Sequence, residues 1–232
     1  MHMFKEMKVI AVAINKGGAG KTTTAKSLAT AAAAAGLNVL ILDMDTQQNS
    51  VKWSRRRATQ QENPLPLVRF TTEGDLADEL DRARAAGCDL AVIDTPPGRS
   101  SEGPAAVEAA DLVLIPFVAE DVDAFDGVPP TARLARMAGK PAAGILNFAF
   151  PGSKAQEETA RGVLDAIGLP MVPVVLQRFN AHRDANPKGL TAQEYEPGSR
   201  AAQDVDALWK WVCSELQDGT SATVHKKRKA VA

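Results

Sequence analysis

A glycine-rich segment near the N-terminus contains the residue types that bind phosphate groups. The sequence NKGGAGKTT at positions 15–23 ends in the G-K-T of the phosphate-binding pattern G-x-x-x-x-G-K-[ST]. Glycines let successive N–H groups turn towards phosphate oxygens, and the following helix N-terminus adds partial positive charge. Asn15 replaces the first glycine of the pattern, and Lys16 adds a second cation. The segment therefore predicts a phosphate site with one lysine more than the pattern requires.

The two lysines of this segment have different expected tasks. Lys21 is in position to reach the β- and γ-phosphates, and the Thr22 hydroxyl is in position to ligate Mg²⁺. Lys16 is close enough in sequence to repel Lys21 unless an anion lies between them. We therefore expect Lys16 to face a phosphate as well, with plain solvent exposure as the alternative.

Three carboxylates end apolar segments that read as strands. Asp43 and Asp45 follow VLIL, and Asp94 follows LAVI ahead of Thr-Pro-Pro-Gly. In open α/β sheets, ligands bind outside the carboxyl ends of the strands, which is where these side chains would lie. Either member of the first pair could instead cap the next helix.

The elements that must position these residues alternate between strand and helix. Apolar runs without strict alternation are typical of strands buried on both faces of a parallel sheet. The expected strands are Lys8–Ile14, Asn38–Leu42, Leu67–Phe70, Asp89–Ile93, Leu112–Phe117, Ala143–Phe148 and Met171–Leu176. The expected helices are Lys21–Ala35, Leu76–Ala86, Asp121–Met137, Ser153–Ile167 and Gly198–Leu216.

This alternation predicts an α/β fold with a doubly wound, mostly parallel twisted sheet and helices on both faces. A length of 232 residues, with 45% hydrophobic and 24% charged residues, fits one soluble domain. We expect residues 1–217 to form that domain and residues 218–232, which end in a basic cluster, to form a flexible tail.

The motifs together resemble one family. KGGAGKTT resembles the deviant Walker A box K-G-G-x-G-K-[ST]-T of the ParA/MinD superfamily of P-loop NTPases. The stretch DMDTQQN resembles that family's D-x-D-P-Q-x-N, with Thr46 in place of proline, and DTPP resembles its D-x-P-P. The resemblance runs from about Lys8 to Val212 and is greatest to short ParA proteins, which lack an N-terminal helix-turn-helix domain.

The resemblance implies an ATPase that hydrolyses ATP with Mg²⁺. It implies that Lys16 acts across a dimer interface, that Asp45 holds the attacking water, and that Asp43 and Asp94 lie beside Mg²⁺ together with Thr22. Asn147, in GILNF, stands where the family often contacts adenine. The expected nucleotide-binding residues are Lys16, Gly17, Gly18, Ala19, Gly20, Lys21, Thr22, Thr23 and Asn147, of which Lys16 and Lys21 are also expected to be catalytic, with Asp45.

The resemblance further implies ATP-dependent homodimers that bind DNA without sequence preference and act in plasmid or chromosome partition. Such proteins are cytoplasmic, associate with the nucleoid, and hydrolyse ATP slowly until stimulated by a ParB-type centromere-binding adaptor. Because the net charge is −1, DNA contacts must come from local basic patches. The candidates are Arg178, Arg183, Lys188 and Arg200. Arg55–Arg57 and Lys226–Lys229 are further basic clusters, for which a solvated surface is the alternative.

Other functions of the same fold remain possible on sequence grounds. A membrane-cycling ATPase of the MinD kind needs a C-terminal amphipathic helix, but only Val224 and Val231 are bulky aliphatic residues after Leu216. An iron–sulfur scaffold needs paired cysteines, whereas Cys88 and Cys213 are isolated. A ligase acting on a small molecule, or a relative that positions a different cargo, would share the phosphate loop.

Overall fold

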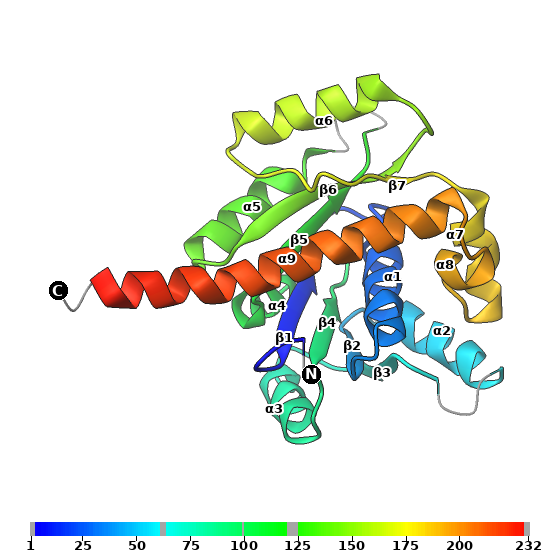
Figure 1. The fold of residues 1–232 in the computed structure, drawn as a ribbon, viewed down its shortest axis with the longest axis horizontal. Coiled ribbons are helices and arrows are strands. Elements are labelled where there is room, and N and C mark those ends of the chain that lie inside the picture. Colours follow the sequence, from blue (N-terminus) through cyan, green and yellow to red (C-terminus); the bar gives the residue numbers. More distant parts are fainter. Residues whose placement is uncertain (1–2, 61–63, 99, 120–124, 230–232) are drawn as a thin grey trace.

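The protein is described by a computed structural model that covers residues 3–60, 64–98, 100–119 and 125–229, with side chains described as far as residue 217. Its centre is one parallel sheet of seven strands (Figure 1). In spatial order the strands are β3 (Leu67–Phe70), β2 (Val39–Asp43), β4 (Leu90–Asp94), β1 (Lys8–Val12), β5 (Leu112–Phe117), β6 (Ala142–Ala149) and β7 (Leu176–Gln177). The predicted fold class is confirmed.

The register of the sheet brings the candidate site residues to one edge. Asp94 pairs with Asp43 on one side and with Val12, the last residue of β1, on the other. The strand order reverses around β1, since β1 lies between β4 and β5. The phosphate loop that follows β1 therefore lies at the switch point of the sheet, next to both carboxylates.

Helices cover both faces of the sheet. Their bounds are α1 (Lys21–Ala34), α2 (Asn49–Ala58), α3 (Leu76–Ala85), α4 (Glu102–Ala109), α5 (Val128–Met137), α6 (Lys154–Ala166), α7 (Asn180–Ala185), the 3₁₀ turn η2 (Asn186–Lys188), α8 (Ala192–Tyr195) and α9 (Arg200–Lys229). Helices α1 and α9 contact each other on one face, and α3, α4, α5 and α6 pack on the other. Figure 1 shows α9, in orange and red, crossing the sheet beside α1.

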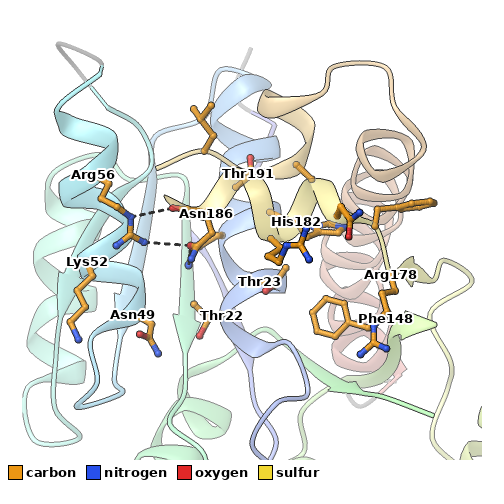
Figure 2. Close-up of a pocket in the computed structure, with 17 residues that line it drawn as sticks. Thr22, Thr23, Asn49, Lys52, Arg56, Phe148, Arg178, His182, Asn186 and Thr191 are labelled. Atoms are coloured by element: carbon orange, nitrogen blue, oxygen red, sulfur yellow. Dashed lines mark hydrogen bonds between the residues drawn. The ribbon is translucent and has the colours of Figure 1, made fainter. Parts of the chain in front are cut away.

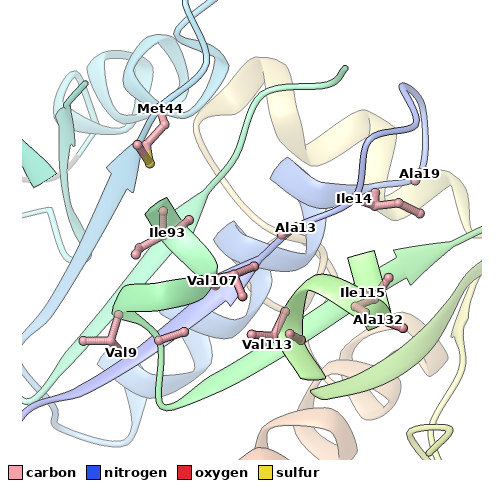
Figure 3. Packing of buried hydrophobic residues seen from close by; sticks show 14 of the residues in the cluster. Val9, Ala13, Ile14, Ala19, Met44, Ile93, Val107, Val113, Ile115 and Ala132 are labelled. Carbon is pink, nitrogen blue, oxygen red and sulfur yellow. The ribbon is translucent and has the colours of Figure 1, made fainter. Parts of the chain in front are cut away.

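Alternate residues of the central strands enter the two halves of the core. In β1, Val9 and Ala11 pack with α4 and α5, in the cluster of Figure 3, whereas Ile10 and Val12 pack with α1 and α9. Successive side chains of a strand point to opposite faces, so a strand covered on both faces must be apolar throughout. This explains why the sequence shows continuous apolar runs.

The alanine-rich helix α1 lies tight against the sheet. Ala25, Ala29 and Ala32 are fully buried on its inner face. Because alanine projects little from the helix, the backbone of α1 can approach the strands closely, and its first turn is held directly behind the phosphate loop. The helix ends ahead of Gly36, whose φ is 86°.

Two expectations about secondary structure were wrong. The seventh strand was predicted at Met171–Leu176, but β7 comprises only Leu176–Gln177, with an isolated bridge between Met171 and Gly144. Pro170 and Pro173 have no N–H to donate to a ladder, which explains the break. The last helix was expected to end at Leu216, but α9 continues to Lys229, so most of the expected tail is helical.

Other differences concern shorter elements. Helices α2, α4, α7 and α8 were not predicted, and α5 begins at Val128. The first residues of the expected helix Asp121–Met137 lie outside the described residues.

Candidate nucleotide-binding site

The phosphate loop leads from β1 into α1 through two left-handed glycines. Gly18 has φ 74° and Gly20 has φ 87°. A side chain is strained at either angle, and at Gly20 a Cβ would also lie 2.6 Å from Nδ2 of Asn147. Thr24 N–H donates to the carbonyl of Gly20, so α1 starts at the end of the loop. The predicted strand–loop–helix context is confirmed.

The two lysines of the loop lie in different surroundings. Lys21 is buried, and its Nζ donates to the backbone carbonyl of Lys16 over 2.9 Å. Burial lowers the pKa of Lys21, and the charges of Asp94 and Asp45 oppose that shift. Lys16 is half-buried at the entrance of the loop, where a Cβ on Gly127 would lie 3.3 Å from its own Cβ. Lys21 is thus directed into the loop, whereas Lys16 stands at its rim.

Asp43 anchors the start of α2. Its carboxylate is fully buried and accepts hydrogen bonds from the N–H groups of Asp45, Ser50 and Val51, at 3.1, 2.9 and 3.1 Å. Burial raises the pKa of Asp43, and these three donors oppose the shift. The helix-capping alternative therefore describes what Asp43 does in this structure, and its place beside Mg²⁺ stays a prediction.

Asp94 has the features expected of a carboxylate that contributes to a cation site. It is buried at the end of β4, and its Oδ2 accepts from Oγ of Ser50 over 2.8 Å. Among the described residues, its Oδ1 has no hydrogen-bond partner. Burial and the nearby charge of Asp43 raise the pKa of Asp94 to about 6, against the opposing effect of the Ser50 and Thr22 hydroxyls. A hydrated Mg²⁺ would satisfy the unpaired oxygen.

The described residues contain no group of three His, Cys, Asp or Glu side chains that could hold a metal by themselves. Mg²⁺ usually keeps several waters and binds one or two protein groups together with substrate phosphates. Thr22 and Asp94 at the edge of the phosphate loop fit that mode, with Mg²⁺ supplying neutralisation of phosphate charge when bound.

Asp45 lies at the start of the turn between β2 and α2. Its side chain is almost buried, at 9% exposure, and its Oδ1 accepts from the N–H of Gln47 over 2.8 Å. The turn is closed by a bond from Gln48 N–H to the Asp45 carbonyl. The carboxylate is thus held in one orientation near Lys21, whose pKa it raises.

Asn147 braces the phosphate loop from β6. Its Nδ2 donates to the carbonyl of Ala19 over 3.0 Å and to Oγ1 of Thr24 over 2.9 Å. Its Oδ1 is buried and has no hydrogen-bond partner within the part of the chain that the structure describes. The amide therefore supports the loop, and its expected contact with adenine stays a prediction.

A cleft of about 680 Å³ opens beside Thr22 and Thr23. Figure 2 shows Asn49, Lys52 and Arg56 of α2 on one side of these threonines and Phe148 and Arg178 on the other. The basic residues that line it are Lys26, Lys52, Arg56, Arg178 and Arg183, and its lining contains no Asp or Glu. A cleft of this size and charge suits an anionic ligand of nucleotide dimensions.

Comparison with protein families matches residues 10–203 to the CobQ/CobB/MinD/ParA nucleotide binding domain. The chain belongs to this family. The predicted ParA/MinD kinship is confirmed, and with it the expected activity class, an ATPase that uses ATP and Mg²⁺.

Individual relatives cover almost the whole chain. It is 30% identical over 217 residues to the maintenance of carboxysome distribution protein A of Gloeobacter kilaueensis, covering 90% of this chain and 94% of that protein. It is 28% identical over 244 residues to the chromosome-partitioning ATPase Soj of Thermus thermophilus, covering 92% and 98%. The structure of MinD complexed with Mg-ADP from Pyrococcus horikoshii superposes with a TM-score of 0.70 at 18% identity, covering 89% and 96%, which shows a shared fold.

The candidate DNA-binding residues of this ParA/MinD-type ATPase are all exposed in its C-terminal third. Arg178 lies over the Phe150 ring at 5.4 Å, and Lys188 lies over the Tyr195 ring at 4.3 Å. Arg183 pairs with Asp184, and Arg200 begins α9. Since α8 contacts both α7 and α9, these cations share one corner of the molecule.

The basic triplet of α2 divides into different roles. Arg57 is buried, lies 5.3 Å from the Trp53 ring, and forms a two-pronged ion pair with Glu194. Arg56 Nε donates to the carbonyl of Asn186, and Arg55 is exposed. Only part of this triplet is therefore solvated, and Arg57 is a structural residue. The side chains of Lys226–Lys229 lie outside the described part of the chain.

Sequence reasoning missed several residues of the site, including Lys26 and Lys52 in the lining of the cleft. Ser50 joins the start of α2 to Asp94, and Phe148 lines the cleft beside the loop. Ser50 lies one residue beyond the motif, and Phe148 follows Asn147 directly, so proximity to a motif residue was the only available signal. In the described residues, no helix is apolar and long enough to cross a membrane.

Proposed function

We propose that this protein is an ATP-dependent switch that dimerises around bound nucleotide, binds DNA without sequence preference, and positions a cargo in the cell. The observation that carries the proposal is the arrangement of the two lysines. Lys21 alone supplies the cation that one phosphate site requires, while Lys16 stands at the rim of the same loop. A second subunit facing this rim would bring its own Lys16 to the phosphates.

The roles of the site residues follow from this arrangement. Lys21 and the loop N–H groups hold the phosphates, and Thr22 and Asp94 hold Mg²⁺, with Asp43 behind them fixing α2. Asp45 orients the attacking water. Lys16 of each subunit neutralises charge on the partner's phosphates, so the dimer forms with ATP and weakens when the γ-phosphate leaves.

The DNA-binding surface is the basic corner formed by Arg178, Arg183, Lys188 and Arg200. Two of these residues, Arg178 and Arg183, also line the nucleotide cleft. Bound nucleotide and DNA would therefore act on the same segment, β7 to α7. Binding through phosphate contacts carries no sequence preference and weakens steeply with salt.

The cargo is not specified by these motifs. Relatives with the same motifs are named for carboxysome distribution and for chromosome partitioning, two different cargoes. A plasmid or chromosome addressed through a ParB-type adaptor is our preferred assignment, with the protein in the cytoplasm on the nucleoid. The adaptor would also stimulate ATP hydrolysis by the nucleotide-bound dimer.

Co-sedimentation with DNA tests this function. The protein is incubated with non-specific duplex DNA and ATP, ADP or no nucleotide over a salt series, and we expect binding only with ATP and only at low salt. The double variant Arg183→Ala with Lys188→Ala should lose binding. Arg84→Ala, which removes an exposed arginine of α3, is the matched control and should bind normally. Equal binding in all nucleotide states would contradict the proposal.

A further inference from the structure

Phe148 occupies a strained backbone position beside the phosphate loop. It follows Asn147 near the end of β6, and its φ is 55°. Bulky residues rarely adopt left-handed backbone, and where they do so the surrounding structure must hold them in place, often at a ligand site. The pairing of β6 with β7 shifts register between Asn147 and Ala149, so the irregularity at Phe148 accounts for this angle and re-aims its side chain.

The ring is fixed between two elements. A Cβ on Gly20 would lie 2.9 Å from Cε2 and 3.0 Å from Cζ of Phe148, so the ring lies directly on the loop backbone. On α7, the His182 ring approaches with 6.5 Å between centroids and 69° between planes. Burial lowers the pKa of His182, so this neighbour is a neutral aromatic ring. Phe148 is thus held from both sides rather than free to rotate into solvent.

The half-buried ring also borders the nucleotide cleft. Phe148 lines it together with Thr22 and Thr23, the first residues after the loop lysine (Figure 2). Phosphates held by the loop leave the nucleoside to extend past these threonines. The Phe148 ring is one of three aromatic rings in the lining of the cleft, with those of Phe179 and His182. Nucleobases stack on aromatic rings because both present apolar π-faces.

We infer that Phe148 is the stacking platform for the base of the bound nucleotide, so that it sets affinity for the nucleoside while the loop sets affinity for the phosphates. This rests on the nucleotide site proposed above. The adjacent Oδ1 of Asn147, buried without a partner among the described residues, would accept from the base amino group. Consecutive residues of β6 then contact the edge and the face of one base.

The test separates base from phosphate. Calorimetric titration with Mg²⁺ compares ATP with inorganic tripolyphosphate, which has no base. We expect Phe148→Ala to weaken ATP binding about tenfold and to leave tripolyphosphate binding unchanged. Phe70→Ala is the matched control, because Phe70 is an exposed aromatic residue at the end of β3 and does not line the cleft. It should change neither affinity.

Two further variants keep the test decisive if the alanine variant does not fold. Phe148→Trp should keep ATP affinity within about threefold of wild type, and its fluorescence should respond to ATP but not to tripolyphosphate. Phe148→Leu, which keeps bulk without a π-face, should bind ATP as weakly as the alanine variant.

Three results would overturn the inference. One is an equal loss of ATP and tripolyphosphate affinity, because the ring would then only support the loop. Another is wild-type ATP affinity in Phe148→Leu. The third is equal affinity of the wild-type protein for tripolyphosphate and for ATP, because the base would then contribute nothing to binding.

Discussion

At the scale of single residues, three carboxylates from two sequence motifs perform different physical tasks. Asp43 binds three backbone N–H groups and holds α2. Asp94 keeps one buried oxygen without a partner among the described residues, and Asp45 is held by the turn that follows it. The sequence indicates that carboxylates lie at this edge. Which task each carboxylate performs depends on the path of the α2 backbone.

Replacing Asp43 tests whether this residue, rather than Asp45, holds α2 in place. Asp43→Ala should lower the free energy of unfolding by about 3 kcal/mol, because buried N–H groups lose a charged acceptor. Asp45→Ala is the matched control, and it should lose less than about 1 kcal/mol since its carboxylate accepts one local bond that water can replace. Urea unfolding of both variants measures the difference. Similar losses in the two variants would show that Asp43 is not a structural anchor.

Lys26 provides a pH-dependent test at the same scale. It is buried, donates to Oδ1 of Asn186, and burial lowers its pKa from 10.5 to about 8. Between these values the unfolded chain holds the proton and the folded chain does not, so stability rises with pH. Relative to Lys26→Met, wild-type stability should rise by about 3 kcal/mol from pH 8 to 10.5. Parallel pH profiles for the two proteins would contradict the assignment.

At the scale of elements, α2 is joined to the C-terminal third of the chain. Trp53 Nε1 donates to the carbonyl of Leu190 over 3.1 Å, and the Arg57 guanidinium binds Glu194 and the carbonyl of Gly189. The same helix begins at Asn49, and its first turn is held by the Asp43 carboxylate. A single helix thus connects the carboxylate edge of the site to the segment that carries the basic corner.

At this junction, the backbone of Gly189 lies directly against the backbone of α2 at Arg57. A Cβ there would lie 2.3 Å from the backbone nitrogen of Arg57, at a φ of 67°. Gly189→Ala should therefore lower stability by about 2 kcal/mol more than Gly36→Ala, which has a similar positive φ but nothing within 4 Å. Thermal and urea unfolding of the pair measure the gap. Equal losses would mean that only backbone strain matters at both glycines.

Elements that are specified by neighbouring residues could be predicted from the sequence, whereas elements that depend on distant contacts could not. The β1–loop–α1 unit is specified by neighbouring residues, namely an apolar strand, two positive-φ glycines and an alanine-rich helix ended by Gly36. Helix α2 depends on Trp53 meeting Leu190, 137 residues away in sequence, and no local pattern reveals that contact. Likewise, the left-handed backbone of Phe148 lies at an irregularity in the pairing of β6 with β7, which no local pattern reveals.

At the scale of the whole molecule, nucleotide state should control assembly. The sheet brings the ends of β1, β2 and β4 to one edge, with Lys16 at the rim of that edge. Lys21 already enters the loop of its own subunit, and we propose that Lys16 reaches the phosphates of a facing subunit. The contact of Lys16 with phosphates bound by the partner subunit is one that only a pair of subunits can make.

The most direct test measures mass in solution by light scattering with Mg²⁺-ATP. It compares the single variant Asp45→Ala with the double variant that also carries Lys16→Ala. Loss of Asp45 should slow hydrolysis and preserve ATP binding, so the single variant should run at twice the monomer mass with ATP and as a monomer with ADP. The double variant should bind ATP and stay monomeric. An ATP-bound double variant that still dimerised, or a single variant that stayed monomeric with ATP bound, would contradict the central role given to Lys16.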